Sequence, residues 1–307
     1  MLADEYRSRG GRLTVAGWRI LTKFATVVFW MCVGLQISCG HSGDSTAKES
    51  PQPVTPQPGP ALGGGAGKLV SSDSDFDRIR AKAESGDAVA QTDTADNYAL
   101  GKGVARDIQK ALKWYRLAAA QNEPRAQFNL GYMYYNGEAL PRDYGKAVEW
   151  LTKAAKQGNS GAQSTLGLMY DNGEGVPEDN AVAIRWYRRA AEQGESMAQF
   201  NLGYMHDNGE GTPENDAEAL KWYLKSAWGG HKEAPNFIGV LYDAGDGAPE
   251  DDLLAYAWWL IGVSRGDEAP LNNIQFLKEQ LTPEQVEKAE RMASQLENQM
   301  ASGTGAP

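Results

Sequence analysis

The sequence predicts an all-α fold, an α/α superhelical solenoid in which helix–loop–helix units stack one on the next. Three observations predict it. The chain matches itself at a step of 36 residues, and glycines punctuate each step at fixed places. Apolar side chains recur within each step at the spacing of one helix face. Neither helix can bury its apolar face within one unit, so neighbouring units must stack.

An alanine opens each unit, and successive openings differ by 36 residues. The openings are Ala90, Ala126, Ala162, Ala198 and Ala234. The five units are therefore 90–125, 126–161, 162–197, 198–233 and 234–269.

The first half of each unit predicts a helix, as the third unit illustrates. Leu166 and Met169 fall four and seven residues after the opening alanine, which places them on one helix face. Gly167 lies inside this helix, where glycine is about 1 kcal/mol less favourable than alanine, so we expect a partner helix to approach closely there. Asn172-Gly173 predicts a left-handed end to the helix.

The second half of each unit predicts another helix. Asp179 stands where its N-cap is needed in the third unit, and aspartate caps helices by accepting a hydrogen bond from an early backbone N–H. A tryptophan recurs in this helix in every unit, at Trp114, Trp150, Trp186, Trp222 and Trp258. We expect these tryptophans to form a ladder in the core.

The two ends of the repeat domain, 73–300, depart from the pattern. Thr92, Asp93 and Thr94 replace apolar residues in the first unit, which predicts a loosened N-terminal cap preceded by half a unit at 76–86. At the other end, Thr282 as N-cap and Pro283 at the first helical position predict a capping helix over 282–300. A loose tail is expected at 301–307.

The composition limits the functions that the chain can have. Its formal charge is −10, and an acidic body repels phosphate backbones, which argues against nucleic acid as a partner. Both cysteines, Cys32 and Cys39, precede the repeats, which excludes a disulfide framework or a cysteine-ligated metal site in the body. No Ser-His-Asp or Cys-His set is evident, so we expect no catalytic residue, cofactor or metal.

The first 39 residues predict an export signal. Basic residues precede an apolar run over 24–37, which as a helix spans roughly 21 Å, short of the ~30 Å hydrocarbon core of a bilayer. The run ends in Ile37-Ser38-Cys39, which resembles a bacterial lipobox and predicts lipidation of Cys39. Simple secretion and an uncleaved anchor are the alternatives. A Pro-, Gly- and Ser-rich stretch over 40–72 predicts a disordered tether. The expected location is the periplasm or the outer membrane.

The repeat resembles the Sel1-like repeat, a relative of the tetratricopeptide repeat. The resemblance covers roughly 75–300 and follows the pattern A-x-x-x-L-G-x-M-Y-x-x-G-x-G-V, then D, then K-A-x-x-W-Y-x-K-A-A-x-Q-G. It implies a superhelix that acts as an adaptor or scaffold for proteins. It also implies an enzyme alternative, since some cysteine-rich members are described as β-lactamases. Those carry a cysteine pair in each repeat, which this chain lacks. A structural role in organising the envelope is a third reading.

The candidate binding residues lie on the side of the first helices that points away from their own core. In a tetratricopeptide-like stack this side lines a concave groove, and aromatic anchors with polar neighbours are typical of protein-binding hot spots. The candidates are Phe128, Tyr132, Tyr135, Leu168, Asp171, Phe200, Tyr204 and Asp207. The predicted partner is a protein or peptide, with membrane contact only through the lipid or signal anchor. The alternative is that these residues pack between adjacent first helices.

Overall fold

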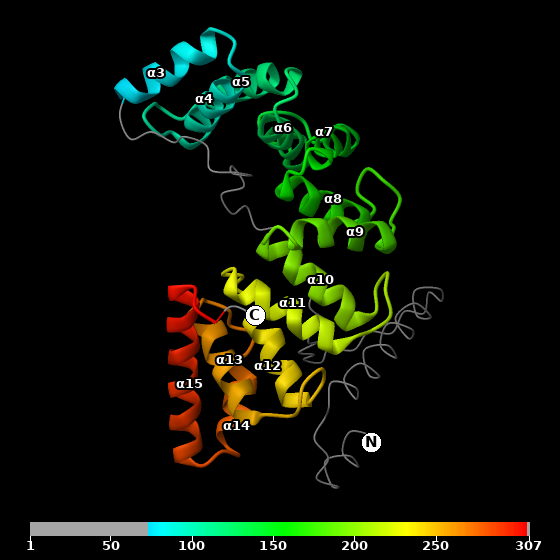
Figure 1. Ribbon diagram of the computed structural model, residues 1–307, viewed down its shortest axis with the longest axis vertical. Coiled ribbons are helices and arrows are strands. Elements are labelled where there is room, and N and C mark those ends of the chain that lie inside the picture. Colours follow the sequence, from blue (N-terminus) through cyan, green and yellow to red (C-terminus); the bar gives the residue numbers. More distant parts are fainter. Residues whose placement is uncertain (1–72, 306–307) are drawn as a thin grey trace, which may run out of the picture. The chain divides into compact units, whose positions relative to one another are not determined.

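The computed structural model describes residues 73–305, and within that range the chain is all-helical (Figure 1). The predicted leader, Cys39 and the tether lie outside the described residues. The first helices of the pairs and the helix before them are α3 Asp73–Glu84, α4 Ala88–Leu100, α6 Pro124–Asn136, α8 Ser160–Asn172, α10 Ser196–Asn208 and α12 Ala234–Ala244. The others are α5 Ile108–Ala120, α7 Tyr144–Lys156, α9 Asn180–Ala191, α11 Asp216–Trp228, α13 Asp252–Ser264, α14 Leu271–Lys278 and α15 Pro283–Ser302. None of these helices has both the length and the apolar character needed to cross a membrane.

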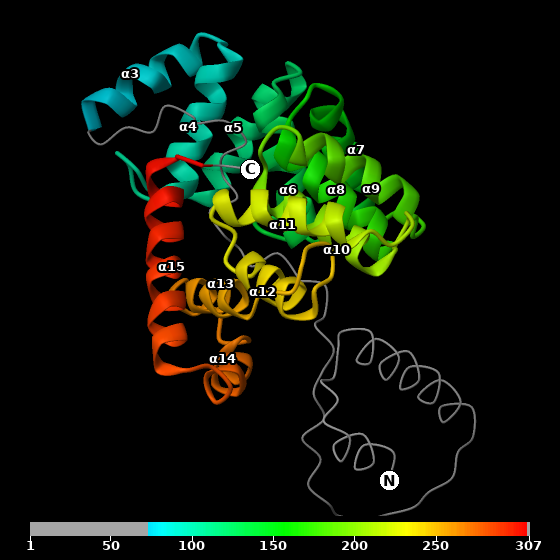
Figure 2. The ribbon, with the colours of Figure 1, turned by 60° about the horizontal axis from the view of Figure 1, so that its bottom comes forward.

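Helices pack in sequence order, which confirms the predicted solenoid. Each first helix packs on the second helix of its own unit, and that second helix packs on the first helix of the next unit. At one end α3 packs on α4, and at the other end α13 packs against both α14 and α15 (Figures 1 and 2). The helix α15 begins with Thr282 as N-cap and Pro283 in its first turn, as the sequence predicts.

In units two to five the glycine inside the first helix lies against the second helix of its unit, as expected. A Cβ atom at Gly167 would lie 2.6 Å from Tyr187 Cδ1, and one at Gly203 would lie 2.8 Å from Tyr223 Cδ1. Such distances are shorter than van der Waals contact, so only glycine lets the two helices come this close. The ~1 kcal/mol penalty of a helical glycine is thus offset by the packing of a whole aromatic ring.

The loop between the two helices of a unit follows the predicted capping pattern. Gly173 ends α8 in the left-handed conformation, with φ of 69°. Gly175 also has positive φ, and a Cβ there would lie 2.7 Å from the backbone oxygen of Tyr144 in the preceding unit. Asp179 then caps α9 by accepting a hydrogen bond from the Val182 N–H, at 2.9 Å. The loop therefore fixes the angle between its helices and also seats against the previous unit.

The expected tryptophan ladder is wrong: the residue after each tryptophan fills the core. Tyr115, Leu151, Tyr187, Tyr223 and Trp259 are at most 2% exposed. Trp114, Trp150 and Trp186 are partly exposed, and only Trp222 and Trp258 are buried. The residue after the tryptophan points about 100° further round the helix. In units two to five this direction places it against the glycine of the facing first helix.

Glutamine side chains link the two helices of a unit and also link the unit to the segment before it. Gln157 Nε2 donates to Gln127 Oε1 at 2.8 Å, and Gln193 Nε2 donates to Gln163 Oε1 at 2.7 Å, in each case within one unit. A third pair of the same kind joins Gln121 to Gln91. The acceptor glutamines also donate to a backbone carbonyl eight residues earlier, which precedes their unit. Buried side-chain amides need partners of this kind, and here the amide oxygen is paired inside the unit and the amide nitrogen across the junction.

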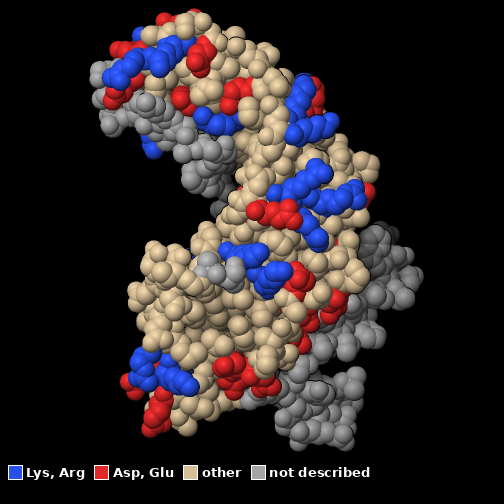
Figure 3. All heavy atoms as spheres, viewed as in Figure 1, with Lys and Arg blue, Asp and Glu red and all other residues tan. Residues whose placement is uncertain are grey.

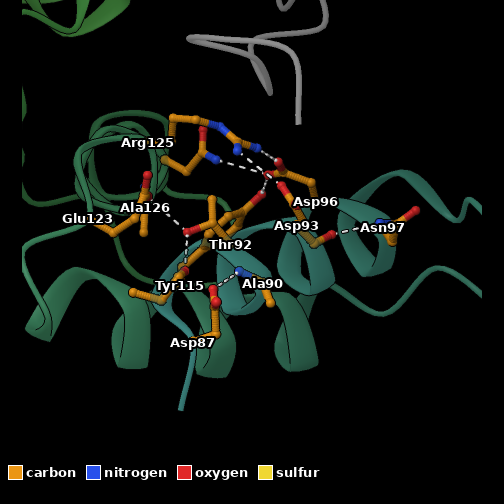
Figure 4. A network of polar contacts seen from close by, with 12 residues as sticks. Asp87, Ala90, Thr92, Asp93, Asp96, Asn97, Tyr115, Glu123, Arg125 and Ala126 are labelled. Atoms are coloured by element: carbon orange, nitrogen blue, oxygen red, sulfur yellow. Dashed lines mark hydrogen bonds and ion pairs between the residues drawn. The ribbon is translucent and has the colours of Figure 1, made fainter. Parts of the chain in front are cut away.

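The first unit is not loosened, contrary to expectation. Its polar residues are buried, and Thr92, Asp93 and Asp96 pair with the residues at the start of α6 (Figure 4). The Thr92 hydroxyl donates to Glu123 Oε2 at 2.8 Å, and Arg125 pairs with both Asp93 and Asp96. Buried polar side chains make a core rigid where their hydrogen-bonding groups are satisfied. Comparing one repeat with another misses these pairs, because Glu123 and Arg125 lie about one repeat further along the chain, on the next first helix.

Candidate protein-binding surface

The eight candidate residues on the first helices fall into two groups by exposure. Four are buried: Phe128, Tyr135, Leu168 and Phe200, each at most 9% exposed. Four are partly exposed: Tyr132, Asp171, Tyr204 and Asp207. Burial favours the alternative reading, packing between neighbouring units, for the first group. The second group remains accessible to a partner.

The buried phenylalanines are covered by residues of the following first helix or of the segment just before it. A Cβ at Gly161 of α8 would lie 3.0 Å from Phe128 Cζ. Phe200 stacks on His231 with ring centroids 4.4 Å apart, and the edge of Phe237 meets it at 5.1 Å. These rings are buried beneath the exposed residues. Removing one would therefore lower the stability of the fold, whatever its effect on binding.

An aromatic chain runs along the first helix of the second unit. The Tyr132 ring lies 5.8 Å from Phe128 and 6.3 Å from Tyr135, centroid to centroid. The Tyr135 hydroxyl donates to Glu174 Oε2 of the next unit at 2.8 Å. Burial, and then this bond, raise the pKa of Tyr135 well above its ordinary value, so Tyr135 stays a neutral donor. This row of aromatic rings therefore ends at the Glu174 carboxylate of the third unit.

Carboxylates from the third and fourth units share the adjoining part of the surface. Burial raises the pKa of Asp171, opposed by a hydrogen bond from Tyr187 and assisted by the charge of Glu178. Burial likewise raises the pKa of Glu210, and the charges of Asp171 and Glu178 add to it. The pKa of Tyr204 is raised by burial and then by the charges of Glu210, Asp207 and Asp171. Asp171 and Glu210 thus repel each other, and both act on this partly exposed aromatic ring.

This arrangement suits the binding of a positively charged group. A cation would relieve the mutual repulsion of the carboxylates, and a tyrosine face attracts ammonium and guanidinium groups. Within 73–305 no three His, Cys, Asp or Glu side chains are placed to hold a metal ion. The surface thus offers such a ligand both negative charge and an aromatic face.

Sequence reasoning missed His231 and Phe237, which cover Phe200. A signal for His231 was present. The corresponding residues Glu123, Asn159 and Glu195 each cap a first helix, and His231 interrupts that series. Burial, and then Arg265, lower the pKa of His231 to about 4. Its imidazole is thus neutral and packs as an aromatic ring.

Comparison with known proteins places the chain in a family. The family model of the Sel1 repeat matches five times, at 88–123, 124–159, 160–195, 196–231 and 233–267. A protective antigen of uropathogenic Escherichia coli strains is 33% identical, with a TM-score of 0.64 over 72% of this chain. A Sel1 repeat protein of Oxalobacter formigenes is 28% identical, with a TM-score of 0.63 over 72% of this chain and 90% of its own.

The chain spans 48% of the length of the E. coli protein. No similar protein was found among the curated proteins. Sel1 repeat proteins generally act as non-catalytic scaffolds for protein interactions. With five matched repeats over more than half of its length, the chain belongs to the Sel1 repeat family.

Proposed function

We propose that this protein is a non-catalytic adaptor of the cell envelope that binds a peptide segment of a partner protein across α6, α8 and α10. One observation carries the proposal. Partly exposed tyrosines and carboxylates from three successive units, Tyr132, Asp171 and Tyr204 among them, form one surface. A solenoid offers such a surface to an extended ligand, since equivalent positions recur along its length.

The ligand is a segment that carries lysine or arginine. The acidic side chains Asp171, Glu178 and Glu210 lie within one another's electrostatic field, while α8 and α10 contain no lysine or arginine. Complementary charge chiefly raises the rate and the specificity of association. The tyrosines supply the apolar contact that holds the complex together.

Export and anchoring complete the proposal, and they rest on the leader. The apolar run over 24–37 and the lipobox-like Ile37-Ser38-Cys39 support cleavage before Cys39 and lipidation of its thiol. The protein would then be attached to the periplasmic side of an envelope membrane. Mass spectrometry of the N-terminal peptide from the membrane fraction tests this. An uncleaved leader with a free Cys39 thiol would contradict it.

A peptide-binding assay tests the surface. The purified full chain is titrated with peptide libraries that differ in net charge, and binding is followed by fluorescence anisotropy. We expect basic peptides to bind, and Asp171→Asn with Tyr204→Ala to weaken them at least tenfold. Glu192→Gln, an exposed acid at the end of α9, is the matched control and should bind as the native chain does. Equal binding of acidic and basic peptides would refute the proposal.

A further inference from the structure

The second helices carry positive charge on an acidic protein. The helices α5, α7 and α9 carry three Lys or Arg each, and Glu149 is their one acidic residue. The chain as a whole has a formal charge of −10. In Figure 3 patches of Lys and Arg follow one another over the stretch from α6 to α11. The bases are therefore segregated and do not alternate evenly with acids.

Six of these bases form no ion pair with a carboxylate of residues 73–305. They are Lys113, Arg116, Lys156, Arg185, Arg188 and Arg189, and we call them the basic face. Each is exposed, and none pairs with an acid within 73–305. Lys110 and Lys146 on the same helices do pair with the N-cap aspartates Asp107 and Asp143. Bases on these helices can therefore form ion pairs with nearby aspartates, but the six residues of the basic face do not.

Tryptophans lie beside the basic face at the repeat spacing. Arg189 Cζ lies 4.8 Å from the centroid of the Trp186 ring, and one unit earlier Lys153, which pairs with Glu149, has its Nζ 4.0 Å from the centroid of the Trp150 ring. Both indoles are partly exposed. Cation–π contact holds the Arg189 guanidinium in place beside an amphipathic ring.

We propose that the basic face binds the anionic headgroups of a lipid bilayer. Lysine, arginine and tryptophan together are the residues of protein surfaces that rest at a membrane interface. The charges are spread over three helices and do not surround one point, which suits a surface of many headgroups better than a single phosphate. Guanidinium groups such as the three on α9 also bind phosphate oxygens in a bidentate manner.

Docking in this way would orient the protein. The six bases are exposed on the second helices, and the tyrosines and carboxylates of the proposed peptide surface lie on the first helices and in the loops that follow them. An anionic bilayer attracts the basic face and repels the acidic surface, so the latter is left accessible to a partner. This goes beyond the proposed peptide binding and does not depend on it.

The experiment reports on docking separately from any insertion of the leader. Leu117 on α5, 52% exposed, occupies the position of Lys153 and Arg189 in their units, and Val89 on α4, 55% exposed, lies on a first helix. Each is changed in turn to Cys in the full chain carrying Cys32→Ser and Cys39→Ser, and is labelled with a fluorophore. Quenching by nitroxide headgroup lipids is measured in vesicles of phosphatidylcholine with and without phosphatidylglycerol. The leader is present with both kinds of vesicle, so the change in the ratio of the two signals on adding phosphatidylglycerol isolates docking.

We expect quenching at 117 to exceed that at 89 only with phosphatidylglycerol, and to fall as salt is added. Changing Arg116, Lys156, Arg185 and Arg188 to Gln should lower the docked-to-undocked ratio by about two to three orders of magnitude. The matched control changes Arg78, Lys278, Lys288 and Arg291 to Gln, which removes the same charge from α3, α14 and α15, and it should dock normally.

Two results would overturn the inference. One is quenching at 117 that is equal in the two kinds of vesicle or is unchanged by the four substitutions on the second helices. The other is binding of soluble polyglutamate that depends on those four bases while vesicles produce no quenching, which would assign the face to an acidic protein segment. Peptide titration of the same variants separates the two proposals, because the four substitutions should leave binding of basic peptides on the first helices unchanged.

Discussion

Replacing Arg125 with methionine should destabilise the first two units strongly. Arg125, 15% exposed, pairs with Asp93 and Asp96, whose side chains are 12% and 5% exposed. Methionine keeps much of the volume and leaves both carboxylates buried without a cation. Removing one partner of a buried ion pair typically costs about 3–5 kcal/mol. Asp96 still accepts hydrogen bonds from Tyr115 at 2.6 Å and from Asn129 at 3.1 Å, so we expect the lower end, about 3 kcal/mol at neutral pH.

The loss should depend on pH. Burial already raises the pKa of Asp96 even with Arg125 present, and removing the cation raises it further. A carboxyl whose pKa is higher in the folded state than in the unfolded state binds more protons when folded. Stability therefore increases as the pH falls through the range between the two pKa values. The gap between Arg125→Met and the native chain should therefore narrow on acidification.

Denaturant unfolding followed by circular dichroism measures the difference in free energy of unfolding between Arg125→Met and the native chain. Hydrogen exchange of α4 to α6 shows where in the chain stability is lost. Adding Asp96→Asn to Arg125→Met removes the unpaired charge and should recover most of the loss. Arg291→Met, which breaks an exposed pair with Glu287, is the control and should cost less than about 0.5 kcal/mol. A loss below about 1 kcal/mol for Arg125→Met, or no recovery with Asp96→Asn, would refute the reasoning.

Three further predictions concern the core. Gly167→Ala should destabilise by about 1–3 kcal/mol, because the added Cβ meets the ring of Tyr187, as thermal unfolding would show. Gln163→Met should cost roughly 1 kcal/mol more than Gln199→Met in denaturant unfolding, since Gln163 Oε1 accepts a bond from Gln193 while the Oε1 of Gln199 has no partner within the described chain. Stability should fall as the pH drops from about 6.5 to about 4, by up to roughly 3 kcal/mol, because the unfolded state protonates His231 first; unfolding at several pH values, with H231F as reference, measures this.

Each of these has a result that would contradict it. Unchanged stability in the alanine variant would mean that the two helices separate at little cost. Equal losses in the two glutamine variants would mean that the hydrogen bond from Gln193 to Gln163 does not contribute to stability. The histidine contribution is opposed by a carboxylate, since Glu233 Oε2 lies 3.4 Å from His231 Nδ1. We expect burial to outweigh that attraction, and an identical pH profile for H231F would show that it does not.

The repeat could be predicted from the sequence because its physical causes are local. A glycine in a helix, an Asn-Gly end and an aspartate cap each act within a few residues, and 36-residue periodicity multiplies the signal. The direction of a side chain within its own pair also follows from helical geometry. This is why Leu166 and Met169 were correctly placed in the core.

Contacts between units could not be predicted in the same way. Helical geometry shows that Phe200 and Tyr204 point away from their own core, but it does not show that His231 and Phe237 cover the first and leave the second partly exposed. Pairing between neighbouring first helices is equally hidden. Asp96 looks like a defect on α4 until Arg125 of α6 is placed beside it.

The glutamine bonds that cross from one unit to the one before bear on how such a chain can change its length. In four units a glutamine at the same position donates to the backbone carbonyl eight residues earlier, at Gln91, Gln127, Gln163 and Gln199. Because the acceptor is a backbone oxygen, a unit inserted or deleted as a whole leaves these amides paired. The last unit breaks this interchangeability, since Pro235 stands at the glutamine position. The link inside the fourth unit also differs, because Gly229 replaces the second glutamine and Ser226 instead donates to the Ser196 carbonyl at 2.7 Å. Units before this junction are exchangeable parts, whereas the last unit and its capping helices form a dedicated end piece.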